Sequence, residues 1–161
     1  MTRPLYQAAQ VLDMAVQVEK DGLAFYSGCA AARQSEAIAE LFAYLADQEK
    51  LHVEVFTEMK KGLAEHTLPE SYAGETEAYI ASLVSDRVFP TADASTAPSD
   101  EMAAIETALD MEKQSILLYA GVRNLVRDSD DEVMDRVIEE EREHIRRLLA
   151  LRHSLDESQD Q

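Results

Sequence analysis

Four long segments of the chain place hydrophobic residues at alternating steps of three and four positions. This spacing puts those residues on one face of an α-helix, as in the helices of a bundle. The pattern stops between the second and third segments, where prolines and small polar residues are typical of a loop. We therefore predict one all-α domain with a helical hairpin at 5–64, a crossover at 65–98, a second hairpin at 99–155 and a polar tail at 156–161.

Residues that commonly cap helices indicate where the predicted helices begin. Ser35 marks the start of the second helix, which places the first turn just before it. Ser99 is expected to cap the third helix, and Ser129–Glu132 fits a capping box that begins the fourth. The crossover is predicted to contain a short helix at about 75–85, and the polar tail is expected to fray.

Acidic residues and histidines interrupt the hydrophobic face of each predicted helix near its middle. The second helix carries Glu49 and His52, and the fourth repeats the motif with Glu141 and His144. Residues three apart on a helix point the same way, so each pair can reach one metal ion. The predicted inner faces are Leu12, Ala15, Glu19, Leu23 and Tyr26; Ile38, Phe42, Leu45, Glu49, His52, Phe56 and Met59; Met102, Ile105, Leu109, Glu112, Ile116 and Tyr119; and Met134, Ile138, Glu141, His144, Leu148, Leu151 and Leu155.

The positions of the turns predict that these polar residues meet. In an antiparallel hairpin, residues equidistant from the turn lie at the same height. The midpoint of Glu19 and Glu49 falls beside the first predicted turn. The midpoint of Glu112 and Glu141 falls beside the second. We therefore expect four carboxylates and two imidazoles in one layer of a four-helix bundle.

Four ionised carboxylates cannot stay unpaired in an apolar bundle, because desolvating each charge is costly. Either several of them hold protons, or cations neutralise them. Two divalent ions would match the charge, and carboxylates with imidazoles suit iron, manganese or zinc. The inferred ligands are Glu49 and Glu141 as bridges, Glu19 and Glu112 as terminal carboxylates, and His52 and His144 with one on each ion.

Two tyrosines lie beside this predicted site. Tyr26 and Tyr119 each follow a core glutamate by seven residues, which is about two turns along the same helix face. Their hydroxyls could donate hydrogen bonds to metal-binding carboxylates, with a radical or electron-relay role or plain core packing as alternatives. Three acidic residues near the second motif, Glu139, Glu140 and Glu143, are expected to face solvent.

The composition narrows the classes of partner and location. A formal net charge of -17 disfavours nucleic acid or an anionic membrane as a partner. The single cysteine, Cys29, excludes an intrachain disulfide and a rubredoxin-type iron site, and we expect it to be a buried core residue. The amino-terminal residues lack the apolar stretch of a signal peptide, and no run is apolar enough to cross a membrane, so we expect a cytoplasmic protein.

The two predicted hairpins are similar in sequence. Ala15–Lys20 matches Ala108–Lys113, and the two Glu-x-x-His motifs occupy equivalent positions. The stretches that carry the family resemblance described next are Glu19-Lys20-Asp21-Gly22-Leu23-Ala24-Phe25-Tyr26, Glu49-x-x-His52, Glu112 and Glu141-x-x-His144.

Through these residues the chain resembles the ferritin-like superfamily, most closely its rubrerythrin-like branch. The resemblance implies a four-helix bundle with a non-haem di-iron centre that reacts with dioxygen or hydrogen peroxide, an external electron donor, and a homodimer. Rubrerythrins add a cysteine-ligated rubredoxin domain, which this chain cannot build, and a further carboxylate where it has Ser115. Bacterioferritins place a haem-binding methionine where it has Lys50.

Three classes of function stay open at this point. The first is a di-iron oxidoreductase or ferroxidase with two Fe ions per chain. The second is an iron-binding and storage protein of ferritin type. The third is a redox-silent structural bundle, with manganese or zinc as other metals for the same residues.

Overall fold

The computed structural model describes residues 3–32, 35–63, 98 and 100–159. Within these ranges the chain forms four long α-helices and one 3-10 turn, with no strand. The predicted short helix at 75–85, and nearly all of the predicted crossover, lie outside the described residues. The elements are α1 (Arg3–Ala31), α2 (Glu36–Leu63), α4 (Glu101–Arg123), η2 (Asp128–Asp130) and α5 (Asp131–Gln159).

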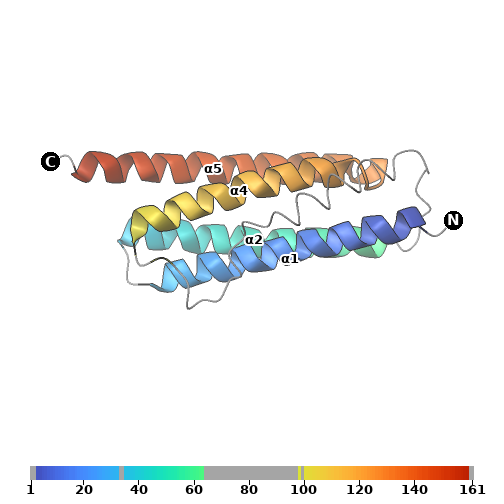
Figure 1. Cartoon of the computed structure of the whole chain (residues 1–161), viewed down its shortest axis with the longest axis horizontal. Helices are drawn as coiled ribbons and strands as arrows, with labels where there is room; N and C mark the ends of the chain where they lie inside the picture. The colour runs from blue at the N-terminus through green and yellow to red at the C-terminus, as the bar shows by residue number, and fades with distance from the viewer. Residues whose placement is uncertain (1–2, 33–34, 64–97, 99, 160–161) are drawn as a thin grey trace.

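The helices form two antiparallel hairpins that pack side by side (Figure 1). Helix α1 pairs with α2, and α4 pairs with α5. Contacts of α1 with α4 and of α2 with α5 join the hairpins into a four-helix bundle. The predicted all-α four-helix bundle is confirmed.

Three helix limits differ from the sequence-based expectation. Asp100, not Ser99, is the N-cap of α4, and its carboxylate accepts a hydrogen bond from the Ala103 N–H at 3.0 Å. The proposed capping box does not begin α5, because Ser129 lies inside η2 and α5 starts after that turn. Helix α5 continues past the predicted limit at 155 to Gln159, through residues that include no glycine or proline, and the fraying of the tail stays a prediction.

Most residues of the predicted inner faces are buried, with exceptions in α1, α4 and α5. Leu12, Glu19 and Tyr26 are fully buried, but Leu23 is only partly buried and Gly22 takes the innermost position between them. Neighbouring residues on a helix point in different directions, so Gly22 and Leu23 cannot both point at α2. The small Gly22 takes that position and lies against Glu49 of α2. Partial burial likewise replaces the full burial expected at Met102, Ile116, Leu151 and Leu155.

The hydrophobic core has two parts with the predicted polar layer between them. One part includes Phe56 and Tyr119, whose ring centroids are 4.8 Å apart. The other includes Tyr26 and Phe42, whose ring centroids are 5.7 Å apart. Aromatic rings therefore close the polar layer on both sides along the bundle axis.

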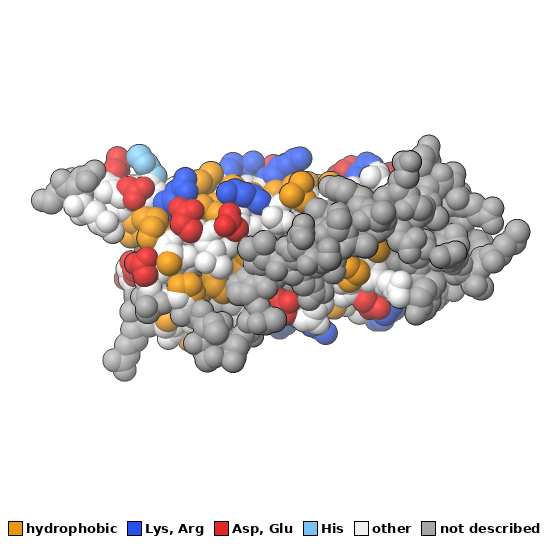
Figure 2. Space-filling view, in the orientation of Figure 1, with side chains coloured by type: hydrophobic (Ala, Val, Ile, Leu, Met, Phe, Trp, Pro, Cys, Tyr) orange, Lys and Arg blue, Asp and Glu red, His pale blue; other side chains and the backbone are white. Residues whose placement is uncertain are grey.

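No helix in the described part of the chain combines the length and apolar character that a membrane crossing requires. Cys29 is a buried free thiol, as expected for a core residue, and burial raises its pKa to about 11. The outer face of α5 instead carries alternating charges: Arg146 and Arg147 pair with Glu143, and Arg152 pairs with Glu106 of α4. Figure 2 shows basic and acidic side chains interspersed on the face that it draws.

Candidate metal centre

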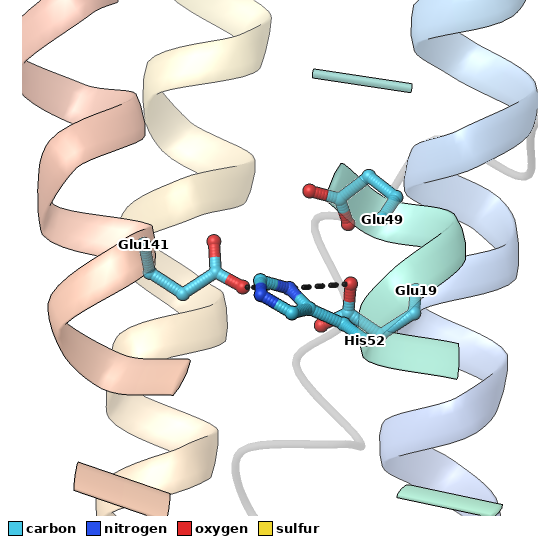
Figure 3. A group of neighbouring side chains, drawn as sticks. All are labelled: Glu19, Glu49, His52 and Glu141. Carbon is cyan, nitrogen blue, oxygen red and sulfur yellow. Dashed lines mark ion pairs between the residues drawn. The ribbon is translucent and has the colours of Figure 1, made fainter. Parts of the chain in front are cut away.

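All six residues that the sequence selected meet in the centre of the bundle. Glu19 comes from α1, Glu112 from α4, and each Glu-x-x-His pair from one of the remaining helices. Their exposed fractions range from 0% to 4%, which is rare for ionisable side chains that have no partner. Figure 3 shows four of them pointing toward one another: Glu19, Glu49, His52 and Glu141.

These side chains form two overlapping groups, each able to offer a ligand atom to one ion. In each group the four offered atoms lie within 4.8 Å of one another. Glu49 and Glu141 belong to both groups, which is the arrangement that bridging carboxylates require. The first group is Glu19, Glu49, His52 and Glu141, and the second is Glu49, Glu112, Glu141 and His144.

Both imidazoles present Nδ1 to the carboxylates. Nδ1 of His52 lies 3.0 Å from Oε1 of Glu141 and 3.4 Å from Oε2 of Glu19. Nδ1 of His144 lies 3.3 Å from Oε2 of Glu141 and 3.4 Å from Oε2 of Glu112. The two rings are stacked with centroids 5.8 Å apart. The nitrogen that would bind metal is therefore the same in both halves.

In the described part of the chain, the buried side-chain N and O atoms without a hydrogen-bond partner all lie in this cluster. Among the described residues, the eight such side-chain atoms all belong to the same six residues. Native proteins seldom leave buried polar atoms unpaired, and here seven of the eight are carboxylate oxygens or an Nδ1. A cation is the partner that oxygens and imidazole nitrogens share, so the donor set fits a bound metal.

The electrostatics of the cluster without metal lead to the same conclusion. Burial, then the charge of Glu19, raises the pKa of Glu49 well above its usual value. Burial alone would lower the pKa of His52, but its close contacts with the carboxylates of Glu141 and Glu19 raise it to about 11. The corresponding contacts raise the pKa of His144 to about 9. Without metal, protons must therefore supply the positive charge that the carboxylates need.

Two tyrosine hydroxyls hold the terminal carboxylates from opposite helices. Tyr26 of α1 donates to Oε1 of Glu112 on α4 at 2.5 Å, and Tyr119 of α4 donates to Oε1 of Glu19 on α1. Each bond occupies one carboxylate oxygen and leaves Oε2 facing the cluster. Burial and the adjacent glutamate raise the pKa of both phenols, so they stay protonated donors.

Gly22 provides the space for one shared carboxylate. A Cβ atom on residue 22 would lie 2.7 Å from Oε2 and 3.2 Å from Cδ of Glu49. Real side chains do not approach so closely, so a larger residue would displace the carboxylate. The hydrophobic pattern alone placed Leu23 on this face and missed the role of Gly22; the glycine within an otherwise helical stretch was the available indication.

Glu140 is a second residue that the sequence reasoning placed wrongly. It was expected to face solvent, but its Oε2 lies 2.9 Å from Nε2 of His52 while 42% of its side chain stays exposed. It therefore reaches inward from the rim of the site. Its neighbours Glu139 and Glu143 do pair with arginines on the outside, as predicted.

Comparisons with known proteins agree with this geometry. The rubrerythrin family model matches residues 10–152. A crystal structure described as a candidate ferritin-like diiron-carboxylate protein from Thermotoga maritima matches 91% of this chain and 94% of that chain, with a TM-score of 0.68 and 25% identity. None of the curated proteins compared with the chain matches it.

Proposed function

Because the chain belongs to the rubrerythrin family, we propose that its six buried polar residues bind two metal ions and that the ions are iron. Glu49 and Glu141 would bridge the ions because they belong to both ligand groups. Glu19 with His52, and Glu112 with His144, would complete the two sites. The observation that carries this proposal is that eight buried polar atoms without hydrogen bonds belong to these six residues alone among those described.

The proposed activity is that of an oxidoreductase or ferroxidase. The chemistry supplied by bound iron is electron transfer to dioxygen or hydrogen peroxide, for which an external donor would return the electrons. Four carboxylates balance the charge of two divalent ions, so the loaded core has no net buried charge. A ligand set of carboxylates and imidazoles without sulfur also favours a hard or borderline ion, such as iron, over a soft one.

The protein's own part is to hold these ligands in a dry and fixed geometry. Tyr26 and Tyr119 orient the terminal carboxylates and keep a proton at each phenol oxygen. We assign the two tyrosines to the reaction as hydrogen-bond donors beside the centre, in keeping with their place at the two edges of the polar layer. The hydrophobic clusters on either side exclude bulk water from the ligands.

Iron content after loading is the direct test. The metal-free protein is given excess Fe(II) in air and desalted, and a plateau at about two ions per chain supports the proposal. Storage would give far more iron, and a value near zero would mean another metal or none. The matched variants are Glu49→Ala and His52→Ala, which should lose iron, and the control is His153→Ala, because His153 is exposed on the outside of α5. Unchanged iron in the first two variants would refute the site.

The assembly and its location form a separate part of the proposal. We expect a homodimer, on the basis of the family resemblance, and we propose a cytoplasmic location. Sedimentation of the loaded protein tests the first point: a monomer at all concentrations would contradict it. Cell fractionation tests the second.

A further inference from the structure

The two halves of the metal centre give their histidines different surroundings. Nε2 of His52 lies 2.9 Å from a carboxylate oxygen of Glu140. Nε2 of His144 is buried and has no hydrogen-bond partner. On the side of the shared carboxylates the halves are alike, since both rings face Glu141 through Nδ1. The difference therefore lies on the outer side of each imidazole.

The internal repeat identifies the residue responsible. Glu140 directly precedes the shared ligand Glu141, and the residue that directly precedes Glu49 is Gln48. The repeat relates α2 to α5, so Gln48 is the counterpart of Glu140 for His144. At equivalent positions of the repeat, one half of the centre thus has a carboxylate and the other a neutral amide, and no side chain hydrogen-bonds Nε2 of His144 among the described residues.

The surroundings of the His144 ring also stabilise a positively charged imidazole less than those of the His52 ring do. Tyr44 meets the His144 ring edge-on, with centroids 6.3 Å apart. The guanidinium of Arg147 lies over the outer side of Tyr44, 4.5 Å from the ring centroid. His144 therefore has an aromatic ring and then a cation beyond it, whereas His52 has an anion.

A carboxylate that accepts the second N–H of a metal-binding histidine fixes the ring and makes the ligand nitrogen more basic. We propose that the two metal positions are unequal, and that the position completed by His52 binds metal first and more tightly because Glu140 positions that ring. This inference rests on the proposed two-metal site. It goes beyond that proposal by ordering the positions and by assigning a positioning residue outside the six ligands.

Cobalt(II) titration of the metal-free protein tests the inequality without reference to activity. We expect two binding steps in the visible absorption and by calorimetry. Glu140→Gln should weaken the first step by about 10–100-fold, the usual cost of losing such a partner, and leave the second step unchanged. Glu139→Gln is the matched control, because Glu139 is the adjacent residue and its ion pairs, among the described residues, are with Arg142 and Arg146 on its own helix. It should titrate like the wild type.

Two further variants show which position fills first. His144→Ala should keep the tight first step, whereas His52→Ala should lose it. Gln48→Glu supplies the missing carboxylate, so it should strengthen the second step and bring the two steps together. Denaturation of each metal-free variant confirms that it is folded before titration.

The outcomes separate this inference from the proposed function. No cobalt binding by the folded wild type would refute the metal site itself. Two ions bound in a single step by the wild type would leave the site standing and refute the inequality, and affinities unchanged in Glu140→Gln would refute the role of Glu140. A loss confined to the second step in Glu140→Gln would also overturn the inference.

Discussion

Gly22 and Glu49 approach so closely across α1 and α2 that a single methyl group on residue 22 would lie 2.7 Å from the Oε2 atom of Glu49. Glu49 belongs to both ligand groups, so its position affects both proposed ions. The space that Gly22 leaves free is thus occupied by a carboxylate that both proposed metal positions share.

Gly22→Ala should therefore separate metal binding from stability. The added Cβ displaces the Glu49 carboxylate, so we expect metal affinity to fall by at least about tenfold, a typical effect of disturbing ligand support. The metal-free helix gains up to about 1 kcal/mol from replacing glycine with alanine, so its stability should hold or rise. Metal titration and chemical denaturation measure the two effects. Gly28→Ala in the same helix is the control, and equal metal affinity in both variants would contradict the prediction.

Removing either phenol hydroxyl should destabilise the bundle. Tyr26→Phe removes the hydrogen-bond donor to Oε1 of Glu112, and Tyr119→Phe removes the donor to Oε1 of Glu19. In both variants the oxygen stays buried. An unsatisfied buried acceptor costs about 1–3 kcal/mol, which urea denaturation of the metal-free protein can detect. Tyr44→Phe keeps a ring against His144 and serves as the control. No loss of stability in the first two variants would argue against these hydrogen bonds.

Replacing a shared carboxylate should stabilise the metal-free protein while it prevents metal binding. Burial and the neighbouring carboxylates raise the pKa of Glu49, so at neutral pH its ionised form opposes folding. Glu49→Gln removes this opposition, and we expect a gain of about 1 kcal/mol or more in the free energy of unfolding in the presence of chelator. With metal present, the wild type should be the more stable of the two proteins. A metal-free variant less stable than the wild type would show that the carboxylates do not repel one another as inferred.

Stability of the metal-free protein should fall as pH rises above about 6.5. The folded-state pKa values of His144 and His52 are raised from 6.5 to about 9 and about 11. The folded state then binds more protons than the unfolded state, so the stabilisation is complete below 6.5 and is lost as pH passes through 9 and then 11. The raised pKa of Glu49 acts in the same direction.

The metal-bound protein should show the opposite trend over the same range. Metal must displace protons from the histidines and carboxylates, so its affinity rises with pH. Thermal denaturation between pH 6 and 9, with chelator and with metal, measures both slopes. Parallel slopes in the two series would contradict the proposed competition between protons and metal.

The sequence by itself determined the four helices and the six central residues. Helix periodicity is a local property, and a carboxylate or imidazole in the middle of a hydrophobic face is visible without a structure. The turn positions then placed Glu19 beside Glu49, and Glu112 beside Glu141, because residues equidistant from the turn of an antiparallel hairpin lie at the same height. These features needed only spacing and side-chain chemistry.

The tertiary structure decided which atoms touch around that set. Crossing angles and helix rotation select Gly22 over Leu23 at the interface with α2, and they turn Glu140 inward to His52. The helix rotations also direct the Tyr26 hydroxyl to Glu112 of α4 and not to Glu19 of its own helix. Such choices depend on rotations of a few tens of degrees between packed helices, which a periodic pattern does not resolve. The sequence alone predicts the six residues of the centre. The different surroundings of His52 and His144 depend on the folded bundle.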